Sequence, residues 1–151
     1  MLNAEILWAL TFILGSLNHS TIHYLRDQVV NEEIINWIKW FSPKNESIWE
    51  HVKMGYFPLL LLTLIFDIKC NIGARIIGLW IHIIVMLCLY YFYTYFITGR
   101  DVLEINIPLF GFSLFIGYLA ENYFINYNLL WLGIPLTLLI VFLSYIDHEK
   151  T

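Results

Sequence analysis

The sequence predicts an all-α, polytopic membrane bundle of five transmembrane helices plus a short interfacial amphipathic helix, in a single integral membrane domain of 151 residues. Hydrophobic residues make up 60% of the chain and charged residues 13%. A soluble domain has roughly 45–50% apolar and about 25% charged residues, so this composition is typical of a membrane protein. It excludes a disordered protein, a secreted disulfide scaffold and an ordinary soluble enzyme.

Five apolar stretches define the predicted spans, and each is long enough to cross a hydrocarbon core of about 30 Å as a helix. Helices are expected because lipid offers the backbone no hydrogen-bond partners. The spans are predicted over residues 6–25, 48–66, 76–97, 105–123 and 129–146. The first span has no basic region before it and no small-residue cleavage site after it, so we expect it to be retained rather than cleaved as a signal peptide.

The Lys and Arg residues predict the orientation of the bundle. Six lie on the side reached after the first, third and fifth spans, and two lie on the opposite side. The six are Arg26, Lys39, Lys44, Lys53, Arg100 and Lys150, and the two are Lys69 and Arg75. Because cytoplasmic loops carry the excess of basic residues, we predict a multi-pass cell-membrane protein with its N-terminus outside and its C-terminus in the cytoplasm.

The connection between the first two spans contains a predicted surface helix over residues 31–41. Its apolar residues fall on one stripe at helical spacing; they are Val30, Ile34, Trp37, Ile38 and Phe41. Asn31 is a suitable N-cap for this helix. We predict that it lies on the cytoplasmic membrane surface, and packing against the bundle is the alternative.

Ionisable residues beside hydrocarbon are costly, so their positions indicate function. His19 and His23 are four residues apart at the cytoplasmic end of the first span and therefore share a helix face. Glu46 and Glu50 share a face in the same way at the start of the second helix, which Ser42-Pro43 begins as N-cap and first residue. His51 lies about 100° round that helix from Glu50.

The surface helix links these two polar ends at one membrane level, so we predict that the five residues form one site. Imidazole and carboxylate groups bind Zn, Fe or Mn, and a catalytic zinc takes three protein ligands and keeps a position open for water. We predict a divalent metal, with Zn favoured, held by His19, His23 and Glu50. Glu46, Glu50 and His51 are the predicted catalytic residues. The sequence has neither an HExxH motif nor a spaced CxxC pair.

The leading functional hypothesis is a metal-dependent hydrolase that acts on a lipid or lipid-linked substrate at the cytoplasmic leaflet, with one glutamate as general base. One alternative is a small transporter or a proton- or ion-conducting module, because Glu and His within membranes also relay protons. Another is a non-catalytic membrane subunit. Membrane lipid is the expected partner, and the sequence leaves homo-oligomer formation undecided. The net charge of −4 and the lack of a basic patch argue against nucleic acid.

One segment resembles a known family. The run Asn45-Glu46-Ser47-Ile48-Trp49-Glu50-His51-Val52-Lys53, preceded by Phe41-Ser42-Pro43 and by the first-span histidine pair, resembles an uncharacterised family of small multi-pass bacterial membrane proteins with an Asn-Glu-Ser-x-Trp-Glu-His-x-Lys motif. The resemblance covers most of the chain in its number of spans and in the position of the motif. It implies no activity, only that Asn45, Glu46, Glu50 and His51 belong together.

A second polar pair is expected nearer the outer side. His82 lies in the third span and Glu121 towards the outer end of the fourth, at a comparable level. We predict that both face the bundle interior and contact each other or a shared water, because an unpaired buried charge is costly. A structural pair is the favoured interpretation, and part of a proton or ion path is the alternative.

Overall fold

The computed structural model describes residues 3–27, 48–67, 71–100 and 103–149. Within these ranges the regular structure is entirely helical, which confirms the all-α prediction. The helices are α1 (Ala4–Asp27), α3 (Ile48–Phe66), α4 (Ile72–Phe92), α5 (Leu103–Phe124) and α6 (Leu130–Glu149), and a π-helical segment η1 (Tyr93–Thr98) continues α4. The predicted surface helix at residues 31–41 lies outside the described residues.

The five α-helices coincide with the five apolar stretches. Helix α3 has the predicted bounds, and the ends of the other four differ from the prediction by a few residues. One of them is long and apolar enough to cross a membrane by length and composition, the continuous stretch Ile72–Thr98. Shorter apolar segments occur at Ala4–Leu17, Val52–Phe66 and Leu130–Leu143.

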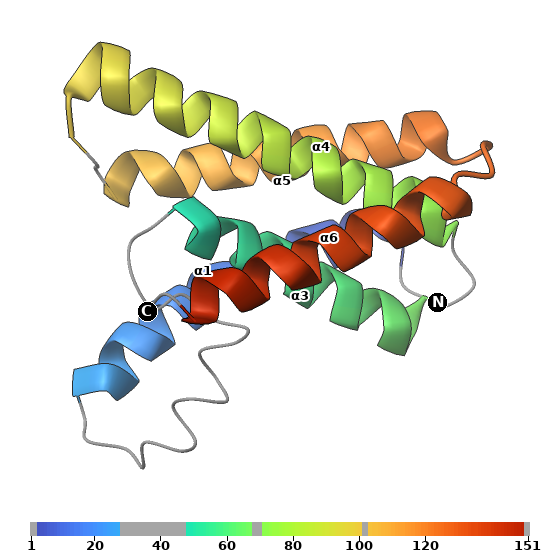
Figure 1. Cartoon of the computed structure of the whole chain (residues 1–151), viewed down its shortest axis with the longest axis horizontal. Coiled ribbons are helices and arrows are strands. Elements are labelled where there is room, and N and C mark those ends of the chain that lie inside the picture. Colours follow the sequence, from blue (N-terminus) through green and yellow to red (C-terminus); the bar gives the residue numbers. More distant parts are fainter. Residues whose placement is uncertain (1–2, 28–47, 68–70, 101–102, 150–151) are drawn as a thin grey trace.

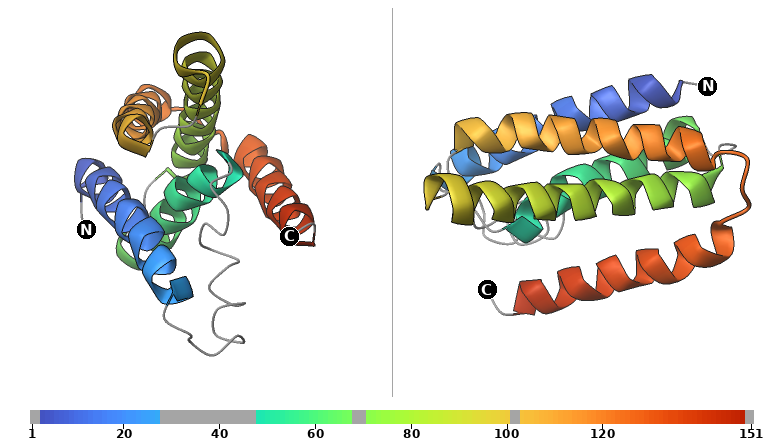
Figure 2. Two further views of the ribbon diagram at one scale, coloured as in Figure 1. Left: turned by 90° about the vertical axis from the view of Figure 1, so that its left-hand side faces the viewer. Right: turned by 90° about the horizontal axis from the view of Figure 1, so that it is seen from above.

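Helix α4 contacts α3, α5 and α6, and in Figure 1 it lies beside α5 in the upper part of the molecule. It runs antiparallel beside α5, while α6 packs on its other side (Figure 2). Helices α1 and α3 cross one another, and α1 also contacts α5. The core lies between α1, α3, α4 and α5, and α6 adds Ile140 to it. Its largest fully buried apolar side chains are Leu7, Val52, Tyr56, Leu59, Leu79, Ile83, Met86, Phe110 and Ile140.

The start of α4 is set by Asn71. Its side chain accepts a hydrogen bond from the backbone N–H of Ala74 at 3.1 Å, which caps the helix. The same amide donates to the carbonyls of Ile125 and Tyr127, at 2.7 and 2.9 Å, in the connection after α5. This cap starts α4 before the predicted span at residue 76, so Arg75 belongs to the helix and not to the preceding loop.

Two close helix approaches depend on glycine. A Cβ built on Gly78 of α4 would lie 2.6 Å from the carbonyl oxygen of Gly117 on α5, and the reciprocal distance is 2.8 Å. A Cβ on Gly15 of α1 would lie 2.7 Å from the carbonyl oxygen of Met54 on α3. That carbonyl has no partner at the usual helical position, because Pro58 four residues later has no N–H. Small residues at these points let the backbones meet.

Many large apolar side chains lie on the outer surface. They include Leu61, Ile65 and Phe66 of α3, Phe112 and Phe115 of α5, and Trp131, Ile134, Leu138 and Phe142 of α6. Exposed apolar area this extensive is unusual for a soluble monomer.

Candidate functional site

The described part of the chain contains one buried group of charged and polar side chains, which we call the Arg75 cluster: Trp8, Thr63, Asp67, Arg75 and Glu121. Arg75 of α4 donates through Nε and Nη2 to Oε1 of Glu121 on α5, at 2.9 and 2.8 Å. Its Nη2 also donates to Oδ2 of Asp67 at 3.2 Å, just after α3. All three ionisable side chains are buried.

Two neutral groups complete the cluster. The indole N–H of Trp8 on α1 donates to Oε2 of Glu121 at 2.6 Å, so both carboxylate oxygens are occupied. Nη1 of Arg75 donates to the hydroxyl of Thr63 on α3 at 3.0 Å. The cluster therefore ties four helices together around one guanidinium, which is how buried charges are usually compensated.

The sequence patterns do not predict the Arg75 cluster. With the third span expected to begin at residue 76, Arg75 counts as a loop charge. Trp8, Thr63 and Asp67 carried no prediction. One available signal was that Arg75 and His82 are seven residues apart, two helical turns, on an otherwise apolar helix.

His82 and Glu121 are both buried in the bundle, as predicted. The predicted direct hydrogen bond between them is not formed, and the alternative, a shared water, stays a prediction. Glu121 is engaged by Arg75 and Trp8 instead, because guanidinium is the stronger partner for a carboxylate. The His82 ring packs edge-on against Phe110, with ring centroids 5.6 Å apart.

The two ring nitrogens of His82 are buried and lack a hydrogen-bond partner within the described part of the chain. The backbone of Ser113 approaches the ring without reaching hydrogen-bond geometry. A Cβ built on Gly55 of α3 would lie only 2.4 Å from Nε2. The absence of a side chain at residue 55 therefore makes room for the imidazole in the centre of the bundle.

The predicted metal residues lie on the two helices that cross. His19 and His23 belong to α1, and Glu50 and His51 to α3. Their side chains, and all of Glu46, lie outside what the structure describes. Among the described residues no three His, Cys, Asp or Glu side chains group as a metal site, and the side chains of the predicted ligands are not among them. The metal site stays a prediction.

The crossing does set the relative levels of the two backbones. Helices α1 and α3 run in opposite directions, and they meet where Gly15 approaches the carbonyl of Met54. Residue 19 lies four residues after Gly15, and residue 50 lies four residues before Met54. Each is therefore about 6 Å along its helix from the contact, and the two backbones reach a similar level there. From there the C-terminal end of α1 and the N-terminal end of α3 diverge (Figures 1 and 2).

Lys53 lies one helical turn after Glu50 and ends the Asn-Glu-Ser-x-Trp-Glu-His-x-Lys motif. It is buried, with 4% of its surface exposed, and it interacts with another group. Lysine is almost never fully buried unless it is paired. The motif therefore ends inside the protein and not in a solvated loop.

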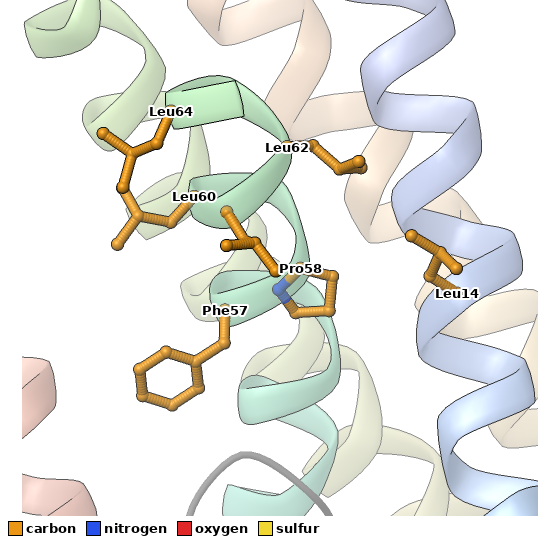
Figure 3. A pocket seen from close by; sticks show the side chains of 7 residues that line it. Leu14, Phe57, Pro58, Leu60, Leu62 and Leu64 are labelled. Carbon is orange, nitrogen blue, oxygen red and sulfur yellow. The ribbon is translucent and has the colours of Figure 1, made fainter. Parts of the chain in front are cut away.

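Among the grooves on the described part of the surface, two have a volume of about 470 Å³ each. The first lies along α3 and is lined only by apolar side chains, with Leu14 of α1 opposite Pro58 and Leu62 of α3 (Figure 3). The second lies between α1 and α5, and its lining includes Glu5, Trp8, Phe12, Phe115 and Tyr118.

Comparison with known proteins assigns the chain to a family. Residues 5–147 match the model of a family of unknown function, DUF6512, so the chain belongs to that family. No curated protein and no solved structure matches it. The expectation of an uncharacterised family is confirmed, while the membrane character and the motif that carried the resemblance stay predictions.

Proposed function

We propose that the protein is a multi-pass membrane protein, with the five α-helices as its spans, the N-terminus outside and the C-terminus in the cytoplasm. The large exposed apolar side chains on α3, α5 and α6 support this proposal, because lipid would cover them. Burial of Arg75 and Lys53 removes one basic residue from each side of the loop comparison. Five basic residues then remain on the predicted cytoplasmic side and one on the opposite side, so the excess still lies on the cytoplasmic side.

We further propose that the crossing of α1 and α3 holds a divalent metal and hydrolyses a lipid or lipid-linked substrate at the cytoplasmic leaflet. The observation that carries this proposal is the close approach of Gly15 to the Met54 carbonyl. Counted one helical turn from this contact along each helix, residues 19 and 50 reach a similar level, which supports a shared site. Lys53, one helical turn after Glu50 on α3, is buried and brings a cation to this part of the helix.

In this proposal His19, His23 and Glu50 hold the metal, which would supply a water activated for attack at neutral pH. Glu46 is not among the three ligands and acts as the general base, since an unliganded carboxylate near the metal suits proton removal. His51 orients or assists. The substrate would reach the site from the inner leaflet.

Metal content of the full chain, purified in a maltoside detergent at neutral pH, tests the first part. We expect about one divalent ion per chain, lost in His19→Ala and Glu50→Ala while the helical circular dichroism is kept. His148→Ala, a histidine near the other end of the chain, is the matched control and should retain the ion. Metal-free wild-type protein would overturn the metal site.

Glu46→Gln separates metal binding from hydrolysis. The variant should keep the ion and lose release of water-soluble products from vesicles of phosphatidylglycerol and phosphatidylethanolamine. Wild-type protein that holds the ion and releases nothing from these vesicles would contradict hydrolysis of these phospholipids. Retained hydrolysis in Glu46→Gln would remove Glu46 as the base.

A second candidate is a proton-conducting module, and one observation favours it. Buried polar groups face the interior from α4 and its continuation at three depths: Arg75, His82 and Tyr93, whose hydroxyl donates to Asn106 of α5. At 1.5 Å per residue these levels are about 10 and 17 Å apart. A relay needs ionisable or hydroxyl groups at several depths on one lining.

Reconstitution into liposomes with an internal pH-sensitive dye tests this candidate. Wild-type protein should dissipate a pH gradient faster than His82→Leu, which removes the central group and keeps an apolar core. Ser16→Ala, a polar-to-apolar change outside the three levels, serves as the control. Equal rates for wild type and His82→Leu would rule out His82 as a relay.

A further inference from the structure

The second groove, between α1 and α5, has features that the proposed functions do not use. Its lining combines apolar residues with four aromatic side chains and one carboxylate: Glu5, Trp8, Ala9, Phe12, Gly111, Leu114, Phe115 and Tyr118. Its volume of about 470 Å³ is within the range of pockets that hold drug-sized ligands, roughly 300–1,000 Å³.

Glu5 supplies the charge of this groove. It lies in the first turn of α1 and is exposed. The hydroxyl of Tyr118 on α5 donates to its Oε1 at 2.8 Å, which orients the carboxylate across the two helices. Among the described residues no Lys or Arg forms an ion pair with Glu5, and the cations of the bundle interior are occupied elsewhere: Arg75 binds Asp67 and Glu121.

The aromatic residues suit a cation as well. Trp8, Phe12, Phe115 and Tyr118 all contribute to the lining, and aromatic faces attract ammonium groups, most strongly when water is excluded. Trp8 is held in place by its hydrogen bond to Glu121 at 2.6 Å, so this wall is pre-organised. Phosphate or sulfate would be repelled by Glu5, since no cation of the lining compensates it.

Gly111 keeps the groove open. A Cβ built there would lie 3.1 Å from the ring of Phe12, so any larger side chain would project into the space between α1 and α5. The apolar part of the lining, including Ala9 and Leu114, suits an alkyl or aryl body rather than a polar one.

We propose that this groove binds an amphiphilic ammonium compound, with its cationic head at Glu5 and Tyr118 and its apolar body along Trp8, Phe12 and Phe115. The occupant is a small amphiphile and not a membrane phospholipid, because a phospholipid head would place a phosphate beside the Glu5 carboxylate. This proposal is independent of the proposed metal site. Glu5 lies near the start of α1, whereas His19 and His23 lie towards its C-terminal end.

Calorimetric titration of the full chain in maltoside micelles tests the proposal with three water-soluble probes of equal chain length. They are hexyltrimethylammonium, the neutral hexanol and the anionic hexyl sulfate. We expect the ammonium to bind about tenfold more tightly than hexanol, from the carboxylate and the aromatic faces together, and hexyl sulfate to bind most weakly. Equal affinity for the ammonium and the sulfate, or no binding of the ammonium, would overturn the proposal.

Two variants assign the binding to this groove. Glu5→Gln keeps size and hydrogen bonding and should remove the preference for the ammonium, while Gly111→Leu should abolish binding of all three probes. Glu149→Gln changes an acidic residue at the far end of α6 and should leave the preference intact. Unchanged affinity for the ammonium in both Glu5→Gln and Gly111→Leu would place binding elsewhere and overturn the assignment. Metal content should not change in either variant.

Discussion

Arg75 of α4 and Glu121 of α5 are joined by two hydrogen bonds to one carboxylate oxygen, Oε1, at 2.9 Å from Nε and 2.8 Å from Nη2. Each side chain is only 3% exposed. The pair lies close to the Gly78–Gly117 contact, since a Cβ on Gly78 would lie 3.2 Å from Cβ of Glu121. The charged pair and the close backbone contact therefore hold the same helix interface.

Neutralising this pair should destabilise the bundle. Glu121→Gln removes one of the two carboxylates that pair with the buried guanidinium, and loss of one partner of a buried ion pair costs about 3–5 kcal/mol. Denaturation by sodium dodecyl sulfate, followed by circular dichroism, measures the change. Glu5→Gln, an exposed carboxylate that also accepts a hydrogen bond, is the control and should change stability by about 1 kcal/mol or less. Equal effects would contradict the structural role of the pair.

The contact between Gly78 and Gly117 should not accept alanine. The added Cβ of Gly78→Ala would meet a backbone oxygen at 2.6 Å, so the helices must separate, at a cost of about 1–3 kcal/mol. Gly133→Ala is the matched control. Its Cβ would lie 3.1 Å from Cδ1 of Ile76, a side-chain end that can rotate away, and at ordinary contact distances of 3.5 and 3.6 Å from Cβ and Cγ2 of the same residue. The same denaturation measurement compares the two, and similar stabilities would show that α4 and α5 are not this close.

His82 and Gly55 should be energetically coupled. Gly55→Ala places a Cβ 2.4 Å from Nε2 of His82 and should destabilise the protein. His82→Ala removes the ring, so the double variant should recover much of the loss caused by Gly55→Ala. A double-mutant cycle should give a coupling energy of about 0.5–3 kcal/mol, as for residues in contact. Strict additivity would mean that the imidazole does not occupy this position.

Metal retention should depend on pH if His19 and His23 are ligands. Neutral imidazole binds the metal, so protonation competes with binding as the pH falls. We expect full occupancy at pH 7 and above, with release below about pH 6. Dialysis at a series of pH values, followed by metal analysis, gives the profile. Retention of the ion at pH 4 would argue against histidine ligation.

The membrane orientation can be measured with reporters fused to the C-terminus. A reporter active only in the cytoplasm should function there, and one active only outside should not. The reason is the excess of basic loop residues on that side. Two additional lysines in the connection between α5 and α6, on the proposed outer side, should reduce the difference in basic residues between the two sides. An externally active C-terminal reporter on the unmodified chain would reverse the proposed topology.

Local pattern was sufficient for the helices. Apolar stretches of helical length predicted α1, α3, α4, α5 and α6, because each stretch is recognisable from consecutive residues alone. The boundary of α4 was less accurate. Asn71 caps this helix through Ala74, but the same amide also binds the carbonyls of Ile125 and Tyr127, and this second interaction depends on residues far along the chain.

The candidate sites divide in the same way. The i, i+4 pairs that predict the metal site are local features, and their convergence depends on a crossing that the sequence does not reveal. Burial of His82 and Glu121 followed from the cost of exposing them to hydrocarbon. The partners of these two side chains could not be predicted in this way, because any hydrogen-bond donor within reach could pair with a carboxylate at that level.

Composition and periodicity alone predict a helical chain that is rich in apolar residues and poor in charge, because both are properties of neighbouring residues. The packing of the helices was needed to find that Arg75 is an interior residue shared by Glu121, Asp67 and Thr63. It was also needed to find that Trp8 completes the cluster and that His82 lies against Gly55. These pairings depend on the rotation and register of α1, α3, α4 and α5. Backbone contacts at small residues set that register, and a difference of one residue turns a side chain by about 100° to another helix face.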